Sequence, residues 1–310
     1  MTKKILIVIT LLLTIIEPSF AAQDRTDRTT TTTTVTDDEV KIGILSWRGP
    51  LGFKKRWQAT ENYLTQTLDR KITFLPLEFK EVLPAVKAGE VDFFTADPSM
   101  FISAKNEYGA SEVLTMKLSH TDSVGAVLFT RADNHKINKL YDLNQKKFGA
   151  LQRWSFGGWQ MAEKEFRNAG IDPYSLLHTL RFFDKPQSVV YAVLSRKVDA
   201  GTVPASILER MVRTKKIDMA DIKILRKKDH PGFPYVCSTE LYPSFPLAKT
   251  AATDQKLADH LAAALRDLQS KDKILQAARI KGWVAPLDYT PIEVVQSQLR
   301  GGGYTGSRRY

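Results

Sequence analysis

The strongest constraint on the fold of this chain is that part of its sequence occurs twice. Residues 41–45, Lys-Ile-Gly-Ile-Leu, reappear as Lys-Phe-Gly-Ala-Leu at 147–151, 106 residues further along. The residues from Thr73 match those from Thr179 at the same offset. At an offset of 107 residues, Ala85-Val86, Val91-Asp92 and Thr95 recur as Ala192-Val193, Val198-Asp199 and Thr202. Because these blocks keep their order and nearly one spacing, we predict two copies of one supersecondary unit.

Each copy has the pattern strand, helix, strand, helix, strand. In the first copy, β-branched and apolar runs predict strands at 40–45, 72–77 and 91–95, and apolar spacings of three and four predict a helix over 53–68 and another over 82–88. In the second copy, strands are expected at 148–151, 180–183 and 200–203, with helices at 158–169 and 189–194. Alternating strands and helices indicate parallel sheets flanked by helices, so the predicted fold class is α/β with two lobes.

The segments around the second copy predict how the lobes connect. An apolar run at 123–131 is long enough to pass between lobes, and 222–225 with 235–238 can carry the chain back. Helical periodicity from Leu257 to Ile280 predicts helices that cap the first lobe. We therefore expect lobe 1 to comprise 40–126 plus 236–300 and lobe 2 to comprise 127–235, with a two-strand hinge that allows closure around a ligand. The alternative is two independent domains in series.

The N-terminus predicts export. Lys3 and Lys4 precede an apolar run over 5–16, and Ser19 and Ala21 place small residues before a cleavage site. This run is too short to cross a bilayer, which needs about 20 helical residues, so residues 1–21 read as a cleaved signal peptide of a periplasmic protein. An uncleaved anchor is the alternative. Residues 22–39 are Thr-rich and predict a disordered spacer or, alternatively, a glycosylated or tethering stalk, and 301–310 predict a flexible tail.

Composition narrows the function classes. The chain carries 45 Lys+Arg against 34 Asp+Glu, a formal net charge of +11, yet its basic clusters are short and scattered, which with export argues against nucleic acid as a partner. A positive field instead draws small anions. The histidines lack metal-ligand spacing, and the single cysteine, Cys237, lies in a β-like run typical of a buried small hydrophobe. We expect neither metal nor cofactor and find no catalytic motif, although a periplasmic enzyme acting on a small anion remains the alternative.

The predicted topology also selects the binding loops, because ligands of open parallel sheets sit beyond the carboxyl ends of the strands. These loops are 46–49, 96–99, 152–158 and 203–206. In 152–158, Ser155 and two glycines open a helix whose backbone N–H groups can bind an anion, while Trp154 or Phe156 packs the rest of the ligand. The alternative is an ordinary N-cap with buried aromatic residues.

Two other loops add polar groups. Asp97 and Pro98 are typical of an N-cap and a first helical position, and if Asp97 instead faces the ligand, it favours an anion that carries a proton or an amine. Arg48 offers a forked donor for an oxyanion, or is a solvated surface charge. The candidate ligand-binding residues are Ser46, Trp47, Arg48, Asp97, Pro98, Ser99, Trp154, Ser155, Phe156 and Gly157.

The chain resembles a known superfamily in motifs spread over Val40 to Tyr304. They include Gly89-Glu90-Val91-Asp92-Phe93, Ser155-Phe156-Gly157-Gly158, Phe233-Pro234 and Gly282-Trp283. With these residues it is similar to the phosphate/phosphonate-type periplasmic solute-binding proteins, and most to the ligand-binding domain of tetrathionate-sensor-like histidine kinases. The resemblance implies a type II periplasmic-binding fold and reversible oxyanion binding at Trp47, 97–99 and 154–157. Sensor-type relatives often carry Arg-Thr where this chain has Pro204-Ala205, which weakens the case for tetrathionate itself.

The sequence thus predicts a monomeric periplasmic binding protein of the Venus-flytrap kind. Its expected ligand is a small oxyanion of the phosphonate, phosphate, sulfonate or thionate class, captured by hinge closure. The expected partner is an ABC permease or a membrane sensor histidine kinase, since signalling would need a kinase that this chain does not contain.

Overall fold

The computed structural model describes residues 39–46, 49–118, 121–268 and 273–301. The predicted signal peptide and nearly all of the predicted spacer and tail lie outside these residues. Glu39, which we placed in the spacer, begins the first strand, and Gly301, which we placed in the tail, ends the last helix.

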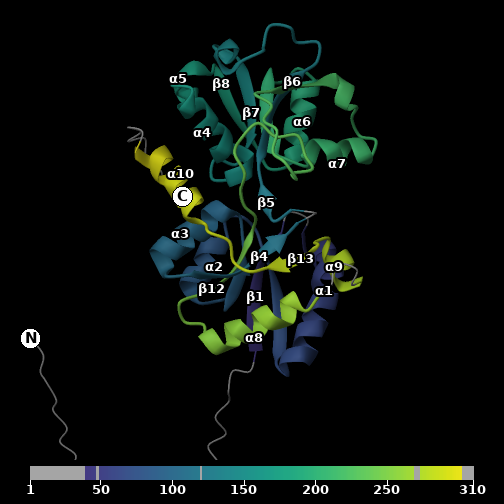
Figure 1. The fold of residues 1–310 in the computed structure, drawn as a ribbon, viewed down its shortest axis with the longest axis vertical. Coiled ribbons are helices and arrows are strands. Elements are labelled where there is room, and N and C mark those ends of the chain that lie inside the picture. Colours follow the sequence, from purple (N-terminus) through teal and green to yellow (C-terminus); the bar gives the residue numbers. More distant parts are fainter. Residues whose placement is uncertain (1–38, 47–48, 119–120, 269–272, 302–310) are drawn as a thin grey trace, which may run out of the picture. The chain divides into compact units, whose positions relative to one another are not determined.

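The first sheet has six strands in the order β13-β4-β12-β3-β1-β2 (Figure 1). One face packs on α1, α8 and α9, and the other on α2, α3 and α10, because apolar side chains of each strand alternate between two separate cores. The strands are β1 (Glu39–Leu45), β2 (Lys71–Leu77), β3 (Phe93–Thr95), β4 (Ser111–Lys117), β12 (Pro246–Lys249) and β13 (Gly282–Val284). The helices are α1 (Gly49–Leu68), α2 (Val82–Ala88), α3 (Pro98–Tyr108), α8 (Gln255–Arg266), α9 (Lys273–Ala278) and α10 (Thr290–Gly301).

The second sheet has five strands in the order β10-β6-β9-β7-β8. One of its faces is covered by η2 and α4 and the other by α6 and α7, again with a core on each side (Figure 1). The strands are β6 (Ala126–Arg131), β7 (Lys147–Leu151), β8 (Thr179–Phe183), β9 (Ala200–Pro204) and β10 (Ile222–Leu225). The helical segments are η1 (Leu140–Leu143), a π-helical turn η2 (Phe156–Gln160) that runs directly into α4 (Met161–Asn168), α5 (Pro173–Leu176), α6 (Pro186–Leu194), α7 (Ile207–Arg213) and η3 (Met219–Asp221).

The structure confirms the sequence duplication. β1 pairs in parallel with β2 and β3, and β7 pairs in parallel with β8 and β9. Asp92 accepts a hydrogen bond from the Lys41 N–H at 2.8 Å, and Asp199 accepts one from the Lys147 N–H at 2.8 Å. In each copy, an aspartate at the equivalent position thus accepts a hydrogen bond from the first residue of the repeated strand motif. The fold is α/β with two lobes, lobe 1 around the six-stranded sheet and lobe 2 around the five-stranded sheet.

The expectation of parallel pairing is confirmed for the repeated strands, and the strands outside the two copies pair antiparallel. β12 runs antiparallel to β3 and β4, β13 to β4, β6 to β9, and β10 to β6. These strands lie outside the duplicated units, so the strand–helix alternation that predicts parallel pairing does not govern them. The segment 222–225 was expected to return the chain to lobe 1, but it forms β10 at the edge of the lobe 2 sheet instead.

Two short segments run side by side where the chain passes between the lobes. β5 (Ser123–Val124) pairs antiparallel with β11 (Tyr242–Pro243). Next to them, the Ser238 N–H donates to the Ala126 carbonyl at 2.8 Å. A Cβ built on Gly125 would lie 2.4 Å from the Cys237 sulfur, so only glycine fits there. Cys237 is fully buried, as its apolar surroundings in the sequence predict. We propose that the lobes divide near 126–127 and 235–236.

Candidate functional site

The structure brings two of the four predicted loops into contact. One follows β3 in lobe 1 and the other follows β7 in lobe 2, each at the carboxyl end of a parallel strand. The residues that meet are Asp97, Ser99, Trp154, Ser155 and Phe156, which we call the interlobe clasp.

The Asp97 carboxylate is the centre of the interlobe clasp, because it caps a helix in each lobe. At the start of α3 it accepts hydrogen bonds from Ser99, from the backbone N–H at 3.0 Å and from the hydroxyl at 2.8 Å. At the start of η2 it accepts the Phe156 N–H, at 3.1 Å to Oδ1 and 3.2 Å to Oδ2. Ser155 precedes η2, yet its hydroxyl does not cap that helix and lies 3.3 Å from Asp97 Oδ2 instead. A carboxylate from lobe 1 thus takes the capping place in lobe 2.

The described residues that donate hydrogen bonds to Asp97 are all neutral. Its side chain is 3% exposed, and among the described residues it forms no ion pair. Burial, which penalises the charged form, raises the pKa of Asp97 to about 6, although the hydrogen bonds from Ser99, Phe156 and Ser155 act in the opposite direction. The carboxylate is therefore well hydrogen-bonded but poorly neutralised.

Further contacts of the interlobe clasp join aromatic groups. Ser99 Oγ lies 2.5 Å from the Trp154 carbonyl oxygen. The Trp154 ring packs against Phe79 with centroids 5.7 Å apart, and Phe156, fully buried, packs edge-on against Tyr242 at 5.0 Å. The expectation that aromatic residues flank the helix start is met in geometry, but Phe156 is buried in the lobe 1 core rather than open to a ligand.

The two glycines after Phe156 have different roles. A Cβ on Gly158 would lie 2.4 Å from the Leu151 Cβ, so glycine is required for η2 to approach β7 this closely. A Cβ on Gly157 would lie 3.5 Å from Pro204, an ordinary contact, and Gly157 is half-buried. The N–H groups in the first turn of a helix have no acceptor within that helix. The Gly157 and Gly158 N–H groups can therefore bind an anion next to the Phe156 N–H, which donates to the Asp97 carboxylate.

The other predicted ligand-binding residues either make no contact with the interlobe clasp or are not among the residues that the structure describes. Pro98 is buried as the first residue of α3. Ser46 is half-buried at the end of β1, where its N–H donates to the Leu77 carbonyl at 2.8 Å. Trp47 and Arg48 are outside the described residues.

Sequence reasoning missed three neighbours of the clasp. Phe79 and Tyr242 pack on its aromatic residues, and Gln296 of α10 donates to the Ser99 carbonyl at 3.0 Å. No local pattern marks Phe79 or Tyr242. The helix that carries Gln296 did leave a signal, because the buried Ile292, Val295 and Leu299 follow one another at spacings of three and four.

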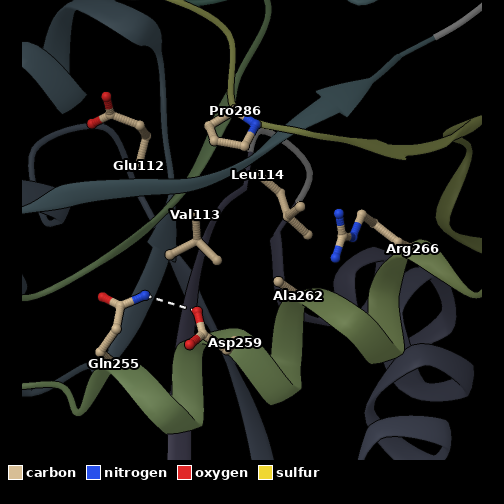
Figure 2. A pocket seen from close by; sticks show the side chains of 8 residues that line it. All are labelled: Glu112, Val113, Leu114, Gln255, Asp259, Ala262, Arg266 and Pro286. Carbon is tan, nitrogen blue, oxygen red and sulfur yellow. Dashed lines mark hydrogen bonds between the residues drawn. The ribbon is translucent and has the colours of Figure 1, made fainter.

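A separate hollow of about 390 Å³ lies on lobe 1 between β4 and α8 (Figure 2). Figure 2 shows the Gln255 amide turned towards Asp259, with 2.9 Å between Nε2 and Oδ1. Arg266 lies further along the same helix. None of the residues lining this hollow is one of the predicted ligand-binding residues. They are Glu112, Val113, Leu114, Gln255, Asp259, Ala262, Arg266 and Pro286.

Comparison with known proteins decides the family. Residues 42–290 match the family model described as ABC transporter, phosphonate, periplasmic substrate-binding protein. The chain belongs to this family. The members of this family are periplasmic substrate-binding proteins. The protein therefore has a solute-binding role and a periplasmic or other extracytoplasmic location. Within the described part of the chain, no helix has the length and apolar character to cross a membrane.

Individual relatives agree with the family assignment. The chain is 29% identical over 266 residues to the tetrathionate sensor histidine kinase TtrS of Salmonella typhimurium; the match covers 84% of this chain but only 43% of that kinase. In fold it is similar to PhnD1 of Prochlorococcus marinus in complex with methylphosphonate, with a TM-score of 0.67 and 14% identity over 85% of this chain and 98% of that one. It is equally similar to a binding-protein component of an ABC phosphonate transporter of Pseudomonas aeruginosa, with a TM-score of 0.67 and 16% identity over 84% and 86% of the two chains. The predicted resemblance and the two-lobed periplasmic-binding fold are thereby confirmed.

Proposed function

We propose that this protein captures a small oxyanion between its two lobes and closes over it by hinge motion. The observation that carries the proposal is the Phe156 N–H at the start of η2, which donates to a carboxylate at 3.1 Å. The predicted anion-binding amide thus already holds an oxyanion group, supplied by the protein itself. The neighbouring Gly157 and Gly158 amides extend the same donor surface.

The ligand class follows from the donors. Backbone amides and the Ser155 and Ser99 hydroxyls suit a group with several oxygens, such as a phosphonate, phosphate, sulfonate or thionate. One similar protein is named as a tetrathionate sensor and another was solved in complex with methylphosphonate, and both compounds are anions of this kind. Pro204, which neighbours Gly157, offers no cation. The guanidinium of Arg48, as the sequence predicts, would donate paired hydrogen bonds to the anion and supply the positive charge.

The partner and the route to the periplasm are part of the proposal. An ABC permease or a sensor histidine kinase would receive the loaded protein, since the family serves importers and the curated relative is a kinase of which this chain spans 43%. Residues 1–21 would direct export as a cleaved signal peptide, and a monomer would suffice for capture.

A ligand screen followed by one substitution tests the function. Thermal shift with phosphate, methylphosphonate, sulfonates and thionates identifies a ligand, because binding to the folded state raises the melting temperature. Ser155→Ala then removes one donor to the anion and should weaken binding about tenfold or more in calorimetry, the usual worth of a hydrogen bond to a charged group.

Ser175→Ala is the matched control. Its hydroxyl donates to Asp172 at the start of α5 in lobe 2, at 2.8 Å. Asp172 and Pro173 begin this helix as Asp97 and Pro98 begin α3, but α5 takes no part in the interlobe clasp. This variant should bind with unchanged affinity. Equal affinities in all three proteins would contradict the proposed site, and no response to any anion would contradict the function.

A further inference from the structure

The Asp97 side chain sits on the start of η2 in the way an anionic ligand would. Both of its oxygens lie within 3.3 Å of donors from lobe 2, namely the Phe156 N–H and the Ser155 hydroxyl. These are donors that we assign to the ligand. A side chain of lobe 1 therefore takes up donors of lobe 2 that an oxyanion would use.

A second Asp-Pro helix start in the same chain shows that capping alone does not demand this reach. Asp172 precedes Pro173 and accepts the Tyr174 N–H at 3.3 Å, as Asp97 accepts the Ser99 N–H. Asp172 stays within its own lobe and lies 3.4 Å from the Arg167 guanidinium. Within the described part of the chain Asp97 has no cationic partner, and it reaches into the other lobe instead.

The balance of forces on Asp97 makes its hold reversible. Five hydrogen-bond contacts from Ser99, Ser155 and Phe156 favour the carboxylate. Burial, with no counter-charge among the described residues, opposes it, as its raised pKa also indicates. If the lobes part, Asp97 keeps both contacts to Ser99 in its own lobe and regains water. Of the hydrogen bonds that Asp97 accepts, only those from Ser155 and Phe156 are lost.

We propose that the Asp97 carboxylate is an internal competitor that occupies the anion-binding donors of the ligand-free protein, and that an incoming oxyanion binds by displacing it from Phe156 and Ser155. This inference rests on the proposed function and adds a selectivity device to it. An anion that binds these donors no better than a carboxylate cannot displace Asp97, so the competitor rejects weak anions and sets the threshold affinity of the site.

Replacing the competitor tests this directly. Asp97→Asn keeps an oxygen that can accept from Ser99 but removes the charge. Calorimetry with inorganic phosphate, sulfate and methylphosphonate should show binding about tenfold tighter than in the wild-type protein, since the lost hydrogen bonds are charge-assisted. Asp172→Asn is the matched control and should leave the affinities unchanged. A wild-type protein that binds a probe while Asp97→Asn binds it equally or more weakly would overturn the competitor, though not the function.

A second measurement needs no ligand. Small-angle scattering of the proteins without added anion should give a larger radius of gyration for Asp97→Asn, and for Asp97→Ala, than for the wild type and Asp172→Asn, because the hydrogen bonds of Asp97 no longer add to the contacts of α10 and Phe156 between the lobes. Circular dichroism checks that each variant is folded. Identical radii for all folded variants would overturn the proposal. If no anion binds any protein but the radii differ as expected, the clasp stands and the proposed ligand class fails.

Discussion

A single carboxyl group accepts hydrogen bonds from both lobes. Asp97 combines almost complete burial with a set of neutral donors from α3 and η2. Its environment differs from that of Asp133, whose pKa is held below the ordinary range by hydrogen bonding to Arg196 and Arg131 at the surface. The two aspartates should therefore respond to pH in opposite directions.

The sign of the Asp97 effect follows from its pKa. Burial raises this pKa to about 6 from 3.8, so between about pH 4 and pH 6 the folded protein binds a proton that the unfolded chain has lost. The contribution of Asp97 to the free energy of unfolding is greatest below pH 4, falls by about 3 kcal/mol as the pH rises to 6, and stays constant above it.

Urea unfolding of the wild type and of Asp97→Asn at pH 4 to 8 measures this contribution as the difference between the two stability curves. Other carboxyl groups cancel in that difference. A difference that is flat across the window, or that grows in the wild type's favour as the pH rises, would contradict the assignment.

At the level of elements, close packing occurs where the chain passes between the lobes. Gly125 leaves no room for a side chain, since its Cβ would lie 2.4 Å from the Cys237 sulfur and 3.0 Å from Leu241 Cδ2. Cys237 is fixed in turn by contacts to the Ala126 and Thr239 carbonyls. Gly125 and Cys237 are therefore packed directly against each other where the chain passes between the lobes.

Gly125→Ala should lower the free energy of unfolding by about 2 kcal/mol, in the range of overpacking a tight core. In a Cys237→Ala background the same change should cost less, because the sulfur that the new methyl group meets is gone. Chemical unfolding of the four proteins in a double-mutant cycle gives the coupling between the two residues. Additive effects would show that the two residues do not meet.

The elements also show what the sequence could and could not predict. The repeated strands and helices were predictable because each copy keeps its periodicity, and the loops after β3 and β7 followed from topology alone. β12, with four residues beginning at Pro246, is too short to leave a periodic pattern. That Asp97 would reach Phe156, 59 residues away, could not be predicted, since both residues have complete local explanations as a helix cap and a core aromatic.

For the whole molecule, the cores of the two lobes are not independent. Phe156 and Met161 belong to lobe 2 by sequence but pack in the core on the α2–α3 face of lobe 1. Lobe 1 can therefore not unfold without exposing apolar surface of lobe 2, and unfolding should be cooperative across both.

We expect one urea transition for the wild type, with near-UV circular dichroism and tryptophan fluorescence coinciding. Phe156→Ala should lower the midpoint, since removing a buried phenylalanine costs about 3–5 kcal/mol, and should separate the two probes into distinct transitions. A single transition that merely shifts would show that the lobes are coupled elsewhere.

The last helix limits how such a molecule can open. α10 packs on α3 in lobe 1 and on α4 in lobe 2, with Gln296 bonded to the Ser99 carbonyl at 3.0 Å and Gln298 to the Lys164 ammonium at 2.8 Å. Two covalent crossings alone would permit both bending and twisting. The non-covalent contacts of α10 form a third connection between the lobes and resist rotation about the two crossings. We therefore expect one lobe to lose its contacts with α10 before the lobes can separate. Because the Lys164–Gln298 hydrogen bond is exposed and the Gln296–Ser99 hydrogen bond is buried, we expect α10 to separate first from lobe 2 and to stay attached to lobe 1.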